Sequence, residues 1–222
     1  ALLEARRFGD AADILQRVLA VVPDDFISHV GMSMIREDEA NIDQAIWYME
    51  RAFEIQPGNG AIQDELRRLY GRREGMEPPK ARLTRSALAR MYAKGDLFEQ
   101  AITEIRAVLA EGQPRPDLEL LLGQLYAELN RSADAVEVLN GLLHKLPNCL
   151  EANRLMMQVL SGAGRAEDTQ AYRQRVAQLD PYAAFTTEMT PSPEQIPNDA
   201  VTLEKLAYHP GVGPAASQQP NW

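Results

Sequence analysis

The stretch that decides the fold runs from residue 117 to residue 147 and reads DLELLLGQLYAELNRSADAVEVLNGLLHKLP. Its apolar residues recur every three to four positions on either side of a polar turn at 130–132, which predicts two amphipathic helices folded against each other. Gly123 and Ala135 are expected where these helices cross most closely, because a larger side chain at either position would push them apart. Pro147 is expected to end the second helix, since proline lacks the backbone N–H and clashes with the preceding turn.

Features of this stretch recur along the chain with a period of 34 residues. This interval separates Pro23 from Pro57 and Pro147 from Pro181. A small residue stands twelve positions before each proline, at Ala11, Ala45, Ala135 and Thr169. An apolar residue stands five positions before each proline, at Val18, Ala52, Leu142 and Val176. A fixed period of this length predicts a stack of helical hairpins, each of which buries its apolar face only against its neighbours. Such an array favours a binding scaffold over a catalyst.

The best-preserved unit resembles the tetratricopeptide repeat, in an array of the bacterial type. Its spacing is L-G-x-x-Y, then A-x-x-x-L, then P, carried by Leu122, Gly123, Tyr126, Ala135, Leu139, Leu142 and Pro147. With the weaker units that follow the same phase, the resemblance extends over roughly residues 1 to 181. It implies an all-α, right-handed superhelical solenoid of antiparallel helix pairs. In this family a concave groove, lined by the first helix of each pair, binds an extended peptide or a helix of a partner protein.

One stretch interrupts the repeat. Ala45 and Ala101 are 56 residues apart, which is one period plus 22 residues. Helices are predicted over 59–73 and 79–94, with the Pro78–Pro79 pair between them. Either one unit lacks its second helix, or the helix 79–94 takes that place. In both cases the superhelix is expected to change direction here.

This interruption and the change in composition after Pro181 divide the chain into four predicted segments. They are N-terminal repeat units over 1–57, the first one truncated; a phase-breaking helix and proline turn over 58–80; a triple of repeats over 81–181; and an extended tail over 182–222. The tail contains six prolines and few charges, and a helical pattern survives in it only over about 199–208. Because the chain opens inside a repeat, we expect it to be a piece of a longer protein.

The composition narrows the classes of function. A net charge of −9 over 222 residues argues against nucleic acid as a partner, because phosphate binding requires a basic surface. No run approaches the roughly 18 apolar residues of a membrane span, so none is expected and a cytoplasmic location is the default. The three histidines lie far apart, and the single cysteine, Cys149, is expected to be a buried, inert thiol. We therefore predict no metal, no cofactor and no catalytic residue.

Positive charge is concentrated in one segment. Residues 58–115 carry 11 basic and 8 acidic side chains, whereas residues 1–57 carry 5 and 11. The excess lies in Arg67, Arg68, Arg72, Arg73, Lys80, Arg82, Arg85, Arg90 and Lys94. The sequence leaves two interpretations open: an ordinary charged helix exterior, or a basic patch that attracts an acidic segment of a partner.

The resemblance also implies which residues face the groove. Carried over from the groove-facing positions of the repeat motif, the candidates for partner binding are Arg68, Ser86, Arg90, Leu120, Gln124, Arg154 and Gln158. Chaperone-binding members of the family use a clamp of Lys and Asn at such positions. Here Gln124 and Gln158 stand where Asn is usual, so a chaperone tail is not expected. The mixture of Arg and Gln suits hydrogen bonding to a peptide backbone that carries one or two acidic side chains.

We therefore predict a protein–protein interaction scaffold without enzymatic activity of its own. Two alternatives stay open. The chain is either a regulatory or substrate-recruiting arm of a larger enzyme or signalling protein, or a self-assembling structural protein whose tail, residues 182–222, docks on another copy.

Overall fold

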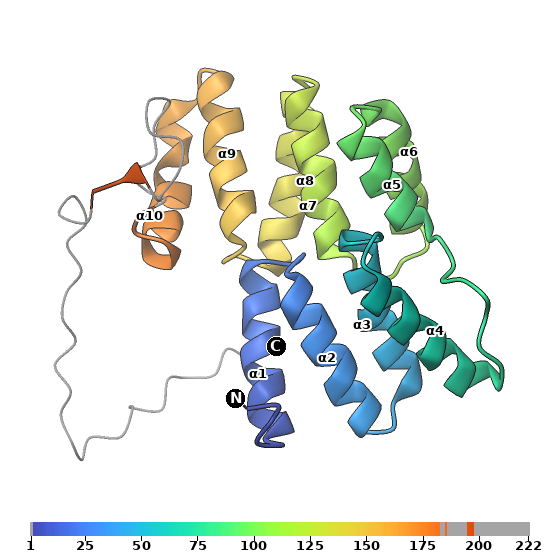
Figure 1. Ribbon diagram of the computed structural model, residues 1–222. Coiled ribbons are helices and arrows are strands. Elements are labelled where there is room, and N and C mark those ends of the chain that lie inside the picture. The colour runs from blue at the N-terminus through green and yellow to red at the C-terminus, as the bar shows by residue number, and fades with distance from the viewer. Residues whose placement is uncertain (1, 183–184, 186–194, 198–222) are drawn as a thin grey trace, which may run out of the picture. The chain divides into compact units, whose positions relative to one another are not determined.

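The computed structural model describes residues 2–182, 185 and 195–197 (Figure 1). Contacts divide the chain into two units, Ala1–Asp180 and Pro181–Trp222. The described residues form ten α-helices and one short 3-10 helix, all in the first unit, and contain neither a strand nor a helix long and apolar enough to cross a membrane. The all-α class is thus confirmed. The helix expected at about 199–208, and most of the tail expected to mediate self-association, lie outside the described residues.

Apart from α4 and α5, which residues 75–84 separate, the helices follow one another through short turns and consecutive helices run antiparallel. In chain order they are α1 (Phe8–Val21), α2 (Phe26–Asp38), α3 (Ile42–Ile55), α4 (Gly60–Glu74), α5 (Arg85–Lys94), α6 (Phe98–Leu109), α7 (Pro116–Glu128), α8 (Ser132–Lys145), α9 (Leu150–Gly162) and α10 (Gln170–Leu179). The 3-10 helix, Ala166–Thr169, directly precedes α10.

Local signals set the start of several helices. The side chains of Asp25 and Asn41 each accept a hydrogen bond from the backbone N–H three residues further on, at the start of α2 and α3. Thr84 caps α5 in the same way. Pro116 occupies the first turn of α7, where its missing N–H removes no helical hydrogen bond. The three side-chain caps satisfy backbone donors that the helices leave unpaired.

Four helix pairs repeat along the chain: α2 with α3, α5 with α6, α7 with α8, and α9 with α10. Where α7 crosses α8, Gly123 and Ala135 are buried, and a Cβ on Gly123 would lie 2.7 Å from Cδ2 of Leu139. At the corresponding crossing of α2 and α3, the hydroxyl of Ser33 donates to the carbonyl of Ala45 at 2.7 Å. The predicted crossing is therefore confirmed, because there is room only for a small residue.

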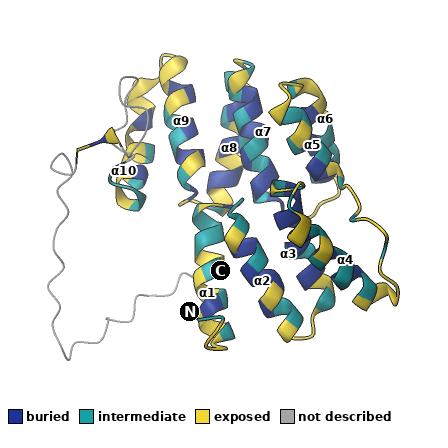
Figure 2. Ribbon diagram, in the orientation of Figure 1, coloured by how far each residue is buried: buried dark blue, intermediate teal, exposed yellow. Residues whose placement is uncertain are grey.

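Neighbouring pairs share their apolar faces. α7 packs against α9, and the second helices α6 and α8 pack against the first helix of the next pair. One buried core runs from α5 to α9, a second fills the space between α3 and α4, and a third joins α1 to α2. Figure 2 shows the buried residues on the helix sides that meet one another and the exposed residues on the outer sides. This is the local pattern of contacts expected of a repeat array.

The repeat is interrupted after α4. Gly75 ends this helix in the left-handed conformation, with φ of 83°, and the next helix begins at Arg85. The prediction of a helix over 79–94 is therefore wrong for its first six residues. The Pro78–Pro79 pair removes two backbone donors, and the start of the helix falls instead where Thr84 provides a cap.

α5 then packs against α3 instead of serving as the second helix of α4. Ala87 of α5 is buried in the core between α3 and α4, and Ala81 packs against that core. Of the two alternatives, the unit that starts with α4 lacks its second helix. In Figure 1, an N-terminal group (α1–α4) and a C-terminal group (α5–α10) meet where α3 ends and where α5 and α7 begin.

Candidate functional site

A groove of about 1000 Å³ lies along the first helices of the C-terminal group. α5, α7 and α9 supply most of its lining. Asp24, in the turn before α2, and Ile55, at the end of α3, contribute from the N-terminal group. The groove therefore follows the row of first helices and is bounded by the junction of the two groups.

The groove has an apolar lining between polar edges. Leu121 and Leu125 of α7 and Leu155 of α9 line it. Ala93 and Ala127 occupy equivalent positions in α5 and α7, one period of 34 residues apart. Because alanine is a single methyl group, a bound chain can approach the helices closely at these two positions.

Three of the seven predicted partner-binding residues line this groove: Arg90 of α5, Gln124 of α7 and Gln158 of α9. They are one period apart, so they form a row across the three helices. The Nε of Arg90 has no hydrogen-bond partner, but it is buried and out of reach of a ligand in the groove. The side-chain amides of Gln124 and Gln158 make no hydrogen bond within the part of the chain that the structure describes. These two amides are available to the backbone of a peptide.

Three other predicted residues do not line the groove. Ser86 and Leu120 are buried between helices, and Ser86 accepts a hydrogen bond from Arg115 at 2.9 Å. Arg154 is half-buried on α9 and lies 3.6 Å from the carboxylate of Glu151. The structure thus separates the buried Ser86 and Leu120 from the row formed by Arg90, Gln124 and Gln158.

The seventh predicted residue, Arg68, belongs to α4. It pairs with Glu65 and with Glu37 of α2, each at 2.6 Å, and these hydrogen bonds raise the pKa of its guanidinium. Most other cations of the basic segment are neutralised nearby in the same way. The ones with a carboxylate partner are Arg67, Arg68, Arg72, Arg73, Arg82 and Arg90. This local pairing favours the interpretation of an ordinary charged helix exterior over that of a basic patch.

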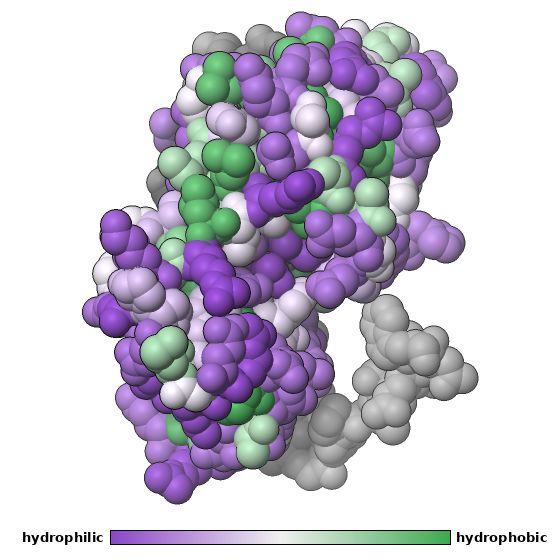
Figure 3. All heavy atoms as spheres, turned by 90° about the vertical axis from the view of Figure 1, so that its right-hand side faces the viewer, coloured by the Kyte–Doolittle hydropathy of each residue, from purple (hydrophilic) through white to green (hydrophobic). Residues whose placement is uncertain are grey.

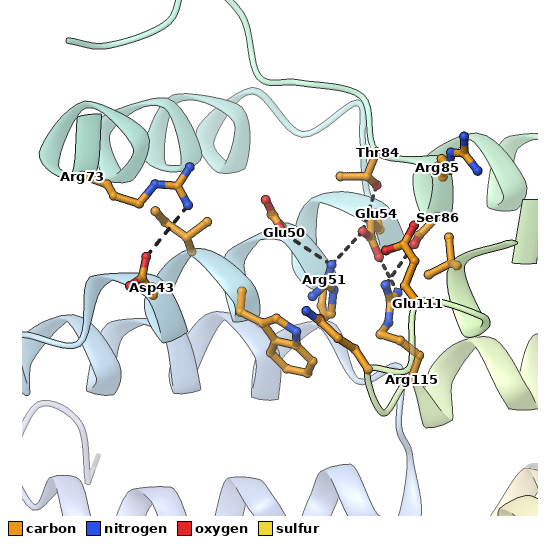
Figure 4. A pocket seen from close by; sticks show the side chains of 14 residues that line it. Asp43, Glu50, Arg51, Glu54, Arg73, Thr84, Arg85, Ser86, Glu111 and Arg115 are labelled. Carbon is orange, nitrogen blue, oxygen red and sulfur yellow. Dashed lines mark hydrogen bonds and ion pairs between the residues drawn. The ribbon is translucent and has the colours of Figure 1, made fainter. Parts of the chain in front are cut away.

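A buried network of charged side chains joins α3, α5 and α7 (Figure 4). Its centre is Arg115, which is 3% exposed and directly precedes α7. The guanidinium donates to both carboxylate oxygens of Asp117, at 2.9 and 2.8 Å. It also donates to Glu54 of α3 at 2.6 Å. Arg90 of α5 donates to Asp117 from the groove side at 2.8 Å.

Glu54 receives further donors at the opposite side of the network. Arg51 donates to its Oε1 at 3.0 Å, and the hydroxyl of Thr84 donates to the same oxygen at 2.8 Å. Glu54 is 1% exposed, so its charge depends on these partners for the solvation that water would otherwise provide. The network therefore holds together the end of α3 and the starts of α5 and α7.

The pairing also determines the protonation of the network. Burial acts to raise the pKa of the Asp117 carboxyl, but the hydrogen bonds and charge of Arg115, with the charge of Arg90, outweigh it. The pKa of Asp117 is therefore held well below its ordinary value of 3.8. Burial acts to lower the pKa of Arg115, and the contacts with Asp117 and Glu54 raise it above the ordinary value. Both groups stay charged at neutral pH.

A second pocket, of about 610 Å³, opens beside this network between α3, the end of α4, the start of α5 and the segment before α7. In it the guanidinium of Arg51 lies over the ring of Trp47, 4.7 Å from the ring centroid. Four arginines and four carboxylates line the pocket, namely Arg51, Arg73, Arg85, Arg115, Asp43, Glu50, Glu54 and Glu111. Figure 3 looks onto the side of α4 to α6, where hydrophilic side chains predominate and apolar ones form small separate groups. Because positive and negative side chains are equal in number, the charges of this pocket favour neither an acidic nor a basic ligand.

Sequence reasoning missed the carboxylates at the edges of the groove. Asp96 and Glu128 lie where α5 and α7 end, and both line it. Asp96 has a φ of 58°, and Asn130 has the same φ in the corresponding turn of the next pair, between α7 and α8. Asp and Asn tolerate this left-handed conformation better than most residues. Their spacing of 34 residues is a signal in the sequence that marks this edge of the groove.

Other reactive side chains suggest no chemistry. Cys149 is buried, and burial raises the pKa of its thiol to about 11, as expected for an inert cysteine. His29 is buried, and its Nε2 donates to the carbonyl of Pro23 at 3.0 Å. Among the described residues, no three or more His, Cys, Asp and Glu side chains are close enough together to hold a metal ion.

Comparison with known proteins identifies the repeat family of one segment. Residues 86–148, from α5 to the end of α8, match the tetratricopeptide repeat family, so the helix pairs in this segment are tetratricopeptide repeats. Among solved structures, the chain is similar to YrrB, described as a TPR protein with an unusual peptide-binding site, at 15% identity and a TM-score of 0.42, over 78% of this chain and 79% of that one. It is similar to MamA at 14% identity and a TM-score of 0.42, over 83% and 95%. No curated protein matches the chain.

Proposed function

We propose that this chain of tetratricopeptide repeats is a protein-interaction scaffold that binds a peptide or helix of a partner protein in the groove along α5, α7 and α9. The main support is the row formed by Arg90, Gln124 and Gln158, in which the two glutamine amides make no hydrogen bond among the described residues and lie beside apolar side chains. The family typically supports protein interaction without catalysis.

The proposed binding mode uses both kinds of surface. Apolar side chains of the partner bury against the partly exposed apolar residues of the lining, which provides most of the affinity. These residues are Ala93, Phe98, Leu121 and Ala127. The amides of Gln124 and Gln158 hydrogen-bond to the partner's backbone and fix its register. Because these amides recur with the repeat, they match a ligand that runs across several helices.

A pair of matched substitutions tests the proposal. Ala127→Trp fills the groove, whereas Ala133→Trp adds the same bulk at an exposed position of α8 outside it. The probe is a displayed library of random peptides of about twelve residues, selected on the whole chain. We expect enriched peptides to bind the unmodified chain and Ala133→Trp equally and to lose binding to Ala127→Trp. A failure to enrich any peptide, or binding indifferent to Ala127→Trp, would overturn the proposal.

Two earlier predictions about the partner stay untested. Self-association through residues 182–222 depends mainly on residues outside those described. The prediction of acidic side chains on the partner depended largely on Arg90 and Arg154, which are already paired with Asp117 and Glu151. The charges that remain at the groove therefore decide which kind of partner it fits.

A further inference from the structure

The charges around the groove define its partner more closely. Resting on the proposed function, we infer that the partner segment carries basic side chains, Lys or Arg, beside its apolar anchors. The inference depends on which charged groups at the groove are already paired within the chain and which are not.

Unpaired carboxylates flank the groove on two edges. Asp96 and Glu128 lie at the edge where α5 and α7 end. Asp24 lies at the edge where α9 begins, close enough for its charge to act on the thiol of Cys149. None of these three carboxylates forms an ion pair with any residue that the structure describes. Glu151 adds a fourth carboxylate, which Arg154 partly compensates at 3.6 Å.

The cations of the groove do not balance these carboxylates. The guanidinium of Arg90 is bound to Asp117 at 2.8 Å and its side chain is 12% exposed, so its charge is used inside the chain. Lys94 also lines the groove and is exposed, without an ion-pair partner among the described residues. One unpaired ammonium against the three unpaired carboxylates leaves a net charge of −2 (1 − 3). The C-terminal ends of α5 and α7 add the negative pole of two helix dipoles at the edge of Asp96 and Glu128.

This arrangement selects against an acidic segment and in favour of a basic one. An acidic peptide would place like charges against both edges, which disfavours its association. Lys and Arg side chains can lay their aliphatic stems on the apolar lining and extend their charged ends to the carboxylates at the edges. The surrounding negative potential also accelerates the encounter with a basic segment at low salt.

The test neutralises the three carboxylates without changing their shape. The groove variant is Asp24→Asn/Asp96→Asn/Glu128→Gln; it spares Asp25, the cap of α2. Asn is also tolerated at the left-handed position 96. A matched variant makes the same change in charge at exposed carboxylates outside the groove: Asp38→Asn/Glu137→Gln/Glu167→Gln. Fluorescence anisotropy with peptides enriched from the displayed library, made synthetically, measures affinity at low salt and at about 0.5 M salt.

We expect the enriched peptides to carry Lys or Arg, and the groove variant to bind them about tenfold more weakly at low salt, as three exposed ion pairs predict. The matched variant should bind as the unmodified chain does, and raising the salt should remove most of the difference. Acidic or uncharged peptides that lose binding to Ala127→Trp but not to the groove variant would overturn this inference and leave the proposed function standing. Binding that is insensitive to Ala127→Trp would overturn the proposed function itself.

Discussion

Replacing Arg115 by Met tests whether the buried network holds the two groups of helices together. The substitution keeps a long apolar side chain and removes the guanidinium that binds Asp117, Glu54 and Ser86. Asp117 then keeps Arg90 as its hydrogen-bond donor within the network. Both carboxylates remain buried, at 5% and 1% exposure, with part of their charge no longer compensated.

The size of the effect follows from that burial. Removing one partner of a buried ion pair lowers the free energy of unfolding by about 3–5 kcal/mol. The remaining donors, Arg90 to Asp117 and Arg51 to Glu54, place the expected loss near the lower end, at about 3 kcal/mol. This is a large part of the roughly 5–15 kcal/mol that stabilises a typical domain. Adding Asp117→Asn should recover part of it, because it removes a buried carboxylate that keeps only Arg90 of its two arginine partners.

Urea denaturation followed by circular dichroism measures these differences. Arg165→Met is the matched control, since the pair of Arg165 and Asp168 is 59% and 52% exposed and should contribute less than about 1 kcal/mol. We also expect Arg115→Met to broaden or split the transition, because the network links the cores on either side of the junction. A loss below about 1 kcal/mol, equal to that of the control, would refute the reasoning.

Three further results are expected. Gly123→Leu should lower the free energy of unfolding by about 1–3 kcal/mol, because the new side chain clashes with Leu139. Gly141→Leu has open space around it and should raise the free energy of unfolding by roughly 0.5–1 kcal/mol through its higher helix propensity. Urea denaturation measures both changes. Cys149 should react with a thiol reagent only as fast as the chain opens, measured by absorbance with and without urea. Because the pKa of Asp117 is lowered on folding, stability should fall as the pH drops below about 4, and Asp117→Asn should flatten that fall in urea midpoints.

The repeat and its crossings could be predicted because they depend on side-chain volume at fixed spacing. Gly123 and Ala135 are small for a steric reason that is visible in the sequence, and the structure places them against Leu139 and each other's helix. The start of α5 could not be predicted with the same rule. Proline at 78 and 79 is compatible with a first helical turn, and the cap at Thr84 prevails because the chain must first cross from α4 back to α3.

The network escaped prediction because its partners are remote in sequence. Arg115 and Glu54 are 61 positions apart, and they meet only because α5 packs against α3. The 34-residue period of the sequence does not predict a pair at this separation. Only some of the predicted groove residues line the groove, for a related reason. The repeat motif specifies which residues lie on the inner face of a helix, but not which of them neighbouring helices bury. Ser86 and Leu120 are covered, whereas Arg90 and Gln124, four residues further along their helices, remain in the groove.

Arg90 connects the buried network to the groove. One of its nitrogens binds Asp117, and through Asp117 it is tied to Arg115 and to Glu54 of α3, while its side chain also lines the groove. The starts of α5 and α7 are therefore held at a set separation before any ligand arrives. A groove whose walls are already fixed loses less conformational entropy on binding. Under the proposed function, the buried charges thus serve affinity as well as stability, and weakening them should reduce peptide binding even where the helices remain folded.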